Sequence, residues 1–159
     1  MKLYDQLVTE TSAEKKQLYS TPIIQSALAG TVSQQNYLAF LTQAYHHVKH
    51  TVPLIMACGS RLTSDQEWLR VAMAKYIEEE LGHQEWILND INAAGGDATR
   101  VRNGKPHMAT ELMVSYAYDI ITRKNPVGFL GMIYVLESTS TELATGAADI
   151  LRTSLGLPD

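Results

Sequence analysis

The sequence predicts an all-α protein, and three observations lead to this prediction. Apolar residues recur at helical spacing along almost the whole chain. Strand-like alternation of apolar and polar residues is nearly absent. Residues that commonly begin or end helices, among them Pro22, Ser33, Pro126 and Gly156, stand at the boundaries of the periodic segments. We therefore expect a helical bundle.

The first third of the chain predicts three helices. The first covers residues 2–19, and Pro22 begins a short second helix because its fixed φ suits the first helical turn. Ser33 is a suitable cap for a helix over residues 34–59. Pro53 lies inside that helix, where we expect it to produce a kink.

The rest of the chain continues the pattern. Ser64 and Glu67 form a capping-box pattern for a long helix over residues 64–94. The segment GGDATRVRNGKPH is the one clear irregular connection. Another helix occupies residues 108–124, and Asn125 with Pro126 begins the last helix, which ends near Gly156.

Composition sets limits on the function. A chain of 159 residues with 45% hydrophobic and 19% charged residues is typical of one globular domain, here residues 1–159. The net charge of −4 makes nucleic acid an unlikely partner. No apolar run approaches the roughly 18 residues that would span a membrane, and the N-terminus lacks a signal-peptide pattern. Because Cys58 is the single cysteine, we expect a cytoplasmic protein.

A carboxylate and a histidine stand on the apolar face of the helix predicted over 64–94. Winding that helix at about 100° per residue places Glu80 between Tyr76 and Met73, inside the apolar arc. Ala74, Leu81 and Ile91 are further members of that arc. His83 lies three residues after Glu80 at the edge of the same face, so the two side chains should be neighbours. Burying a lone carboxylate costs several kcal/mol unless it is paired or binds a metal.

The last helix offers a second inward carboxylate. Glu137 falls among its apolar residues, whereas Glu142 and Asp149 point to the polar side. Two inward carboxylates and a histidine on two helices are typical of iron or manganese sites in helical bundles. The sequence therefore predicts Glu80, His83 and Glu137 as metal ligands. Alternatively, the two glutamates belong to buried hydrogen-bond networks with residues such as Tyr76, Tyr134 or Ser140.

The segment YHHVKH is a second group of histidines. His46 and His50 are four residues apart but fall outside the apolar arc of their helix, whereas His47 lies nearer to it. His47 is therefore the better candidate to line an interior pocket. Four residues are predicted as pocket or redox neighbours of a metal: Tyr45, His47, Tyr76 and Tyr134.

Two runs, YIEEELGHQEWILNDI and NPVGFLGMIYVLESTSTELA, resemble the iron-containing redox proteins of the TenA/PqqC type, which share the heme-oxygenase-like fold and include the heme-oxygenase-like di-iron oxidases. The segment AYHHVKHTVPLIMACGSRL resembles their preceding helix, so the resemblance extends from about residue 33 to the end. It implies that Glu80 and His83 come from one ligand helix and Glu137 from another. In some members the first glutamate lies seven residues before the histidine, where this chain has Tyr76.

The resemblance implies a non-heme iron oxidoreductase that uses dioxygen to oxidise a small organic substrate held between helices. Its cofactor would be iron, in a di-iron or mononuclear site, or manganese. The catalytic residues beyond the ligands are unknown. One alternative is a TenA-like hydrolase of thiamine breakdown products, for which Cys58 is the only available nucleophile. A second alternative is a non-catalytic binding module or remnant of the fold.

The chain departs from the family in its third set of ligands. No Asp-x-x-x-His occurs anywhere, and the chain ends where the family's next helices would begin. We therefore expect the fold to be incomplete at the C-terminus, with 1–159 forming the N-terminal two-thirds of the domain. Missing helices would expose apolar surface, and such patches usually mark interfaces. This predicts a homo-oligomer.

Overall fold

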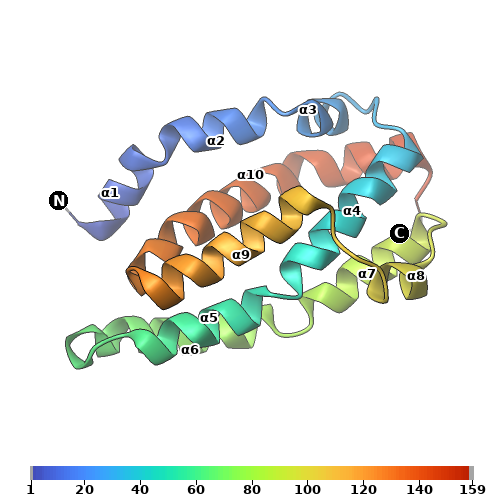
Figure 1. Cartoon of the computed structure of the whole chain (residues 1–159). Coiled ribbons are helices and arrows are strands. Elements are labelled where there is room, and N and C mark those ends of the chain that lie inside the picture. The colour runs from blue at the N-terminus through green and yellow to red at the C-terminus, as the bar shows by residue number, and fades with distance from the viewer. Residues whose placement is uncertain (1, 158–159) are drawn as a thin grey trace. The chain divides into compact units, whose positions relative to one another are not determined.

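The computed structural model describes residues 2–157, apart from the side chain of Thr145. Every regular element in this range is a helix, and the range contains no strand, which confirms the all-α prediction. The elements, labelled in Figure 1, are α1 (Leu3–Glu10), α2 (Ser12–Tyr19), α3 (Pro22–Leu28), α4 (Gln34–Val48), α5 (Thr51–Arg61), η1 (Ser64–Gln66), α6 (Glu67–Glu80), α7 (His83–Ala93), α8 (Ala98–Arg102), α9 (Met108–Arg123), η2 (Pro126–Gly128) and α10 (Phe129–Leu155). Within the described residues, no helix is both long and apolar enough to cross a membrane.

The chain divides into two compact units. Unit 1 comprises Met1–Tyr37 and Leu130–Asp159, and unit 2 comprises Leu38–Phe129. Unit 1 therefore joins segments from the two ends of the chain, whereas unit 2 is continuous. A single domain over residues 1–159 stays a prediction.

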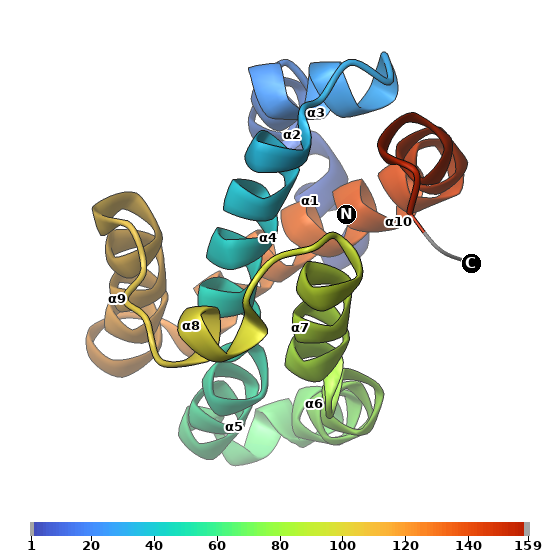
Figure 2. The same cartoon turned by 90° about the vertical axis from the view of Figure 1, so that its right-hand side faces the viewer.

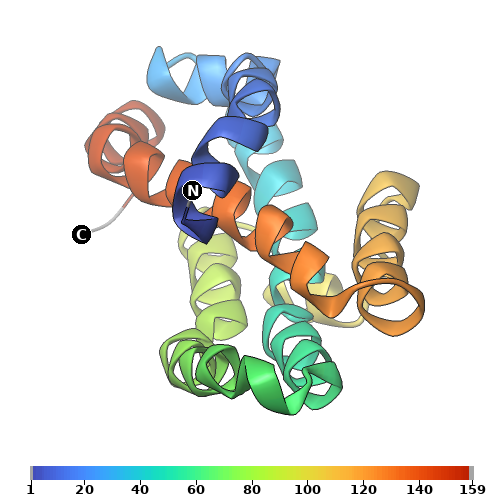
Figure 3. The ribbon, with the colours of Figure 1, turned by 90° about the vertical axis from the view of Figure 1, so that its left-hand side faces the viewer.

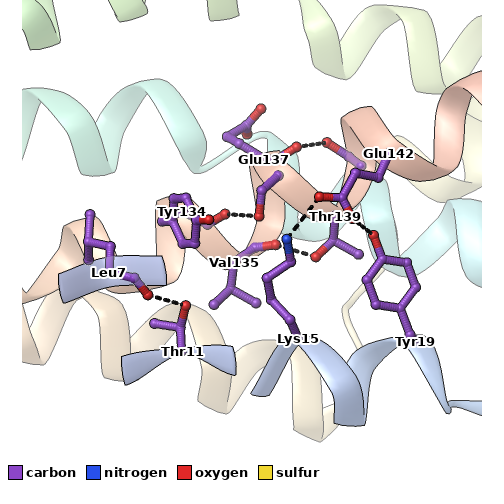
Figure 4. Close-up of polar contacts among 11 residues, drawn as sticks. Leu7, Thr11, Lys15, Tyr19, Tyr134, Val135, Glu137, Thr139 and Glu142 are labelled. Atoms are coloured by element: carbon purple, nitrogen blue, oxygen red, sulfur yellow. Dashed lines mark hydrogen bonds and ion pairs between the residues drawn. The ribbon is translucent and has the colours of Figure 1, made fainter. Parts of the chain in front are cut away.

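In unit 1, α1 and α2 lie beside α10 (Figures 1 and 3). The ring of Tyr4 packs edge-on against that of Tyr134, with 5.9 Å between centroids. Lys15 donates to Glu142 at 3.0 Å, and Tyr19 donates to the same carboxylate (Figure 4). These two hydrogen bonds connect α2 with α10, although the bonded residues are more than 120 positions apart in the sequence.

In unit 2, α5 lies at the centre of the packing. It contacts α6 on one side and α9 with η2 on another, and α7 contacts α8 (Figure 2). Side chains that are fully buried here come from α4, α5, α7 and α9, and they are His46, Leu54, Ile55, Cys58, Ile91 and Ile121. Burial of apolar side chains stabilises the fold by about 1.5–3 kcal/mol each.

Three long helices predicted from periodicity are each broken in the structure. The helix over 2–19 is interrupted at Thr11, and the helix over 34–59 at Lys49 and His50. Pro53 consequently lies in the first turn of α5, where its missing N–H costs no helical hydrogen bond, instead of kinking a longer helix. Apolar periodicity continues across these breaks, which is why the pattern alone did not reveal them.

The third break divides the helix predicted over 64–94. α6 ends at Glu80, and α7 begins at His83. Gly82 between them has φ of 93°, a left-handed conformation that glycine adopts without steric cost. Leu81 lies at the break and is 61% exposed, and Ala74 within α6 is also exposed, so their placement in the apolar arc was wrong.

Several predicted helix ends agree with the structure and one does not. Ser33 Oγ accepts from Asn36 N at 3.1 Å, and Asn125 Oδ1 accepts from Val127 N at 3.1 Å, so both predicted caps are confirmed. The capping box predicted for Ser64 and Glu67 lies one residue earlier, since Thr63 N donates to Gln66 Oε1 at 3.1 Å. The predicted irregular connection contains the short helix α8.

Candidate functional site

Glu80 and His83 form a close pair at the break between α6 and α7. Glu80 is the last residue of α6 and is only 8% exposed, although it is a glutamate. His83 is the first residue of α7, and its Nδ1 lies 3.1 Å from Glu80 Oε2. Neighbouring Glu78, Glu79 and Glu85 are exposed, as the helical pattern predicted. A buried carboxylate at the end of α6 therefore lies beside an imidazole at the start of α7.

The spacing of this pair fits two ligands of one metal ion. Carboxylate oxygen and imidazole nitrogen bind metals at about 2.1 Å, so two such donors at the right angle of an octahedral ion lie about 3.0 Å apart. The observed 3.1 Å between Nδ1 and Oε2 is close to this value. The same distance also suits a direct hydrogen bond between the two side chains. The positions of Glu80 and His83 are thus compatible with binding one metal ion, and they also allow the two side chains to hydrogen-bond to each other without a metal.

The third predicted ligand, Glu137, lies on α10 and belongs to unit 1, whereas Glu80 and His83 belong to unit 2. Glu137 is half-buried, and its backbone carbonyl accepts from Ser140 Oγ at 3.1 Å (Figure 4). The predicted hydrogen-bond partner Ser140 thus contacts the main chain of Glu137. A second predicted partner, Tyr134, packs against Tyr4, and its ring centre lies 5.7 Å from the Lys15 ammonium.

Within residues 2–157, no three histidine, cysteine or acidic side chains lie close enough together to hold a metal ion. Within unit 2, the structure brings Glu80 and His83 together. Carboxylate and imidazole nevertheless remain the ligand types that iron and manganese accept.

The structure reverses the predicted order of burial among the histidines. His46 was placed outside the apolar arc but is 1% exposed, whereas His47 and His50 are half-buried. The reason is the connection before α9, which covers this side of α4: His107 N donates to Gln43 Oε1 at 2.8 Å. The periodicity of α4 alone could not reveal that a distant segment packs against this side of the helix.

His46 is held without a full set of hydrogen bonds. Its Nδ1 lies 3.4 Å from Lys49 Nζ, and its Nε2 has no partner among the described residues. Burial lowers the pKa of His46, and the positive charges of Lys49 and His50 lower it further. Burial also lowers the pKa of His47. These surroundings therefore favour the neutral form of both imidazoles.

A cleft of about 380 Å³ adjoins the break between α6 and α7. Tyr45, one of the predicted pocket residues, lines this cleft together with Leu81 and Gly82. His47 and Tyr76 lie in the same unit but do not line it. Lys49 and Arg102 also line the cleft, and sequence reasoning missed both. The sequence offered one indication that Lys49 lies beside Tyr45, namely their separation of four residues in a helical segment.

Comparison with known proteins identifies the family. A sequence model described as "iron-containing redox enzyme" matches residues 38–159, more than half of the chain. The chain belongs to the iron-containing redox enzyme family. No curated protein sequence matches it significantly.

The fold of this iron-containing redox enzyme family member is similar to that of a solved structure of another protein. It is a domain of unknown function with a heme oxygenase-like fold from Shewanella denitrificans, and it superposes with a TM-score of 0.83 at 24% identity. The alignment covers 99% of this chain and 68% of that one. The predicted heme-oxygenase-like fold is therefore confirmed. Family membership indicates an oxidoreductase-type function, and the family's description points to iron.

The single cysteine of this family member is poorly suited to nucleophilic catalysis. Cys58 is fully buried, its Sγ donates to the Pro126 carbonyl at 3.1 Å, and burial raises the pKa of the thiol to about 11. The thiolate needed for attack is thus scarce at neutral pH. This argues against the TenA-like hydrolase alternative.

We expect iodoacetamide to alkylate Cys58 much more slowly in the folded protein at pH 8 than in urea, as measured by mass spectrometry. Burial raises the pKa of Cys58 above its usual value near 9, so the protonated thiol contributes to the stability of the folded state below pH 9. That contribution should disappear as the pH rises from about 9 to about 11. Equal alkylation rates in the two states would contradict this description.

Proposed function

We propose that the protein is a non-heme iron oxidoreductase that uses dioxygen to oxidise a small organic substrate. The observation that carries this proposal is the buried Glu80 carboxylate paired with the His83 imidazole at 3.1 Å. Membership of the iron-containing redox enzyme family supports iron as the metal and a redox reaction. Manganese would accept the same ligand types.

The position of Glu80 at a helix end supports cation binding. The last carbonyl groups of a helix lack intrahelical partners and carry partial negative charge. Glu80 is the final residue of α6, so its carboxylate adds to the negative potential at that end. A cation held there would offset both the charge and the cost of burying the carboxylate. His83 would then contribute a nitrogen donor beside it.

Glu137 is proposed as the third ligand on the basis of its match to the family pattern. An ion with few protein ligands keeps open positions for dioxygen, and bound iron supplies the change of oxidation state that dioxygen chemistry requires. The residues of this chain hold the ion and place the substrate beside it. Tyr45, His47, Tyr76 and Tyr134 remain proposed neighbours of this site.

A second candidate function is a non-catalytic helical module. It is favoured by the direct contact between Glu80 and His83, because two side chains that satisfy each other need no metal. In this case the pair only joins α6 to α7.

The deciding experiment measures iron per chain by mass spectrometry on full-length protein purified from iron-supplemented cells. We expect about one iron per chain, and a large loss in Glu137→Ala. Asp149→Ala is the matched control, because Asp149 lies on the same helix with a side chain that is 87% exposed. Wild-type protein without iron would overturn the proposal in favour of the non-catalytic module, and iron retained in Glu137→Ala would remove Glu137 from the ligand set.

A further inference from the structure

The cleft beside the α6–α7 break has one apolar wall and one polar wall. Its apolar wall consists of Val48, Val52, Pro53 and Leu81. The segments that form the cleft are the end of α4, the start of α5, the α6–α7 break, the first turn of α7 and the end of α8. All of them belong to unit 2, and Figure 2 shows their helices. A volume of about 380 Å³ lies at the small end of the range for ligand sites.

The polar wall contains one cation without an anionic partner. Arg102 also lines the cleft, but its guanidinium donates to both carboxylate oxygens of Glu85, at 2.9 and 2.5 Å. Lys49 Nζ contacts only neutral groups: it lies 3.4 Å from His46 Nδ1 and 5.6 Å from the centre of the Tyr45 ring. Within the described residues, no carboxylate forms an ion pair with Lys49. The cleft therefore carries an excess of one positive charge.

Tyr45 adds a hydrogen-bond donor to the same wall. Its side chain is 5% exposed, and the hydroxyl has no hydrogen-bond partner among the described residues. Tyr45 lines the cleft, so this hydroxyl can donate to a ligand there.

We propose that this cleft binds a small aliphatic monocarboxylate. Its carboxylate would accept hydrogen bonds from the Lys49 ammonium and the Tyr45 hydroxyl, and its hydrocarbon part would lie on the apolar wall. The single unpaired cation balances the charge of a monoanion, whereas a doubly charged phosphate would keep one negative charge without a partner. The apolar wall requires that the ligand also carry aliphatic carbon atoms.

The cleft has a structural link to the proposed iron site. Leu81 and Gly82, which line the cleft, separate Glu80 from His83 in the chain. The bound carboxylate is therefore the proposed substrate class of that site, and this role rests on the proposed function. Binding itself does not require iron, so the two proposals can fail separately.

Binding is tested by isothermal titration calorimetry on metal-free, full-length protein. The probes are 4-methylpentanoate, its neutral counterpart 4-methylpentanamide, and inorganic phosphate. We expect 4-methylpentanoate to bind with a roughly millimolar Kd, and the other two at least about tenfold more weakly. Equal binding of acid and amide, or tighter binding of phosphate, would overturn the assignment.

Two variants locate the bound carboxylate. Lys49→Gln should weaken 4-methylpentanoate binding about tenfold, because a charged hydrogen bond is lost. Tyr45→Phe removes one hydroxyl without altering the ring and should weaken binding about fivefold. Lys75→Gln, at an exposed lysine outside the cleft, is the matched control. Unchanged affinity in both cleft variants would show that the probe binds elsewhere, and circular dichroism checks that each variant is folded.

Binding of 4-methylpentanoate to protein that takes up no iron would support the cleft and remove its role as a substrate site. Iron uptake without carboxylate binding would overturn the cleft proposal and leave the proposed function intact.

Discussion

Glu80→Gln is expected to lower the affinity for iron by at least about 100-fold, since substitutions of groups that merely support a metal ligand already cost 10–100-fold. Glutamine retains the size of glutamate and can still hydrogen-bond to His83, so the fold should be preserved. It lacks the negative charge that offsets the metal's own charge. Metal content by mass spectrometry, with titration of Fe(II) under anaerobic conditions, measures the change.

Glu79→Gln is the matched control because it makes the same chemical change at the adjacent, exposed position. It should bind iron like the wild type. If Glu80→Gln retained full iron content, Glu80 would be a structural partner of His83 and the metal would have to be bound elsewhere.

Ile121→Ala is expected to destabilise the protein by about 2–5 kcal/mol. Ile121 is fully buried on α9, which packs against α5 and η2, so truncation removes apolar contacts and leaves a cavity. Urea unfolding followed by circular dichroism measures this loss as a shift of the midpoint.

Leu112→Ala provides the comparison on the same helix. Leu112 is 60% exposed, so its truncation should change the free energy of unfolding by no more than about 0.5 kcal/mol. A small effect at Ile121 would mean that α9 does not contribute to the core as its burial indicates.

Helix content and several helix starts could be predicted from the sequence because their signals are local. Pro22, Ser33 and Asn125 each act within one turn of their own positions, and each begins an element as expected. The inward position of Glu80 was also predictable, since it depends on the phase of the last turns of one helix.

The burial of His46 was not predictable in this way, because it depends on a distant segment. Gln43 accepts hydrogen bonds from His107 N and from Thr110 Oγ1, and this connection covers the face of α4 that carries His46. The unpaired charge of Lys49 likewise depends on Arg102 reaching Glu85 from α8. The apolar periodicity of one segment does not indicate which other segment it contacts.

The break at Gly82 changes what the four-letter pattern Glu-x-x-His means in this protein. In an uninterrupted helix, the rise and pitch alone fix the relation between two residues three apart. Here the relation depends on the torsion angles of Leu81 and Gly82, the latter with φ of 93°. Transplanting the same letters onto a straight designed helix would preserve the motif and lose its geometry. A designer who wishes to copy the site must therefore copy the turn.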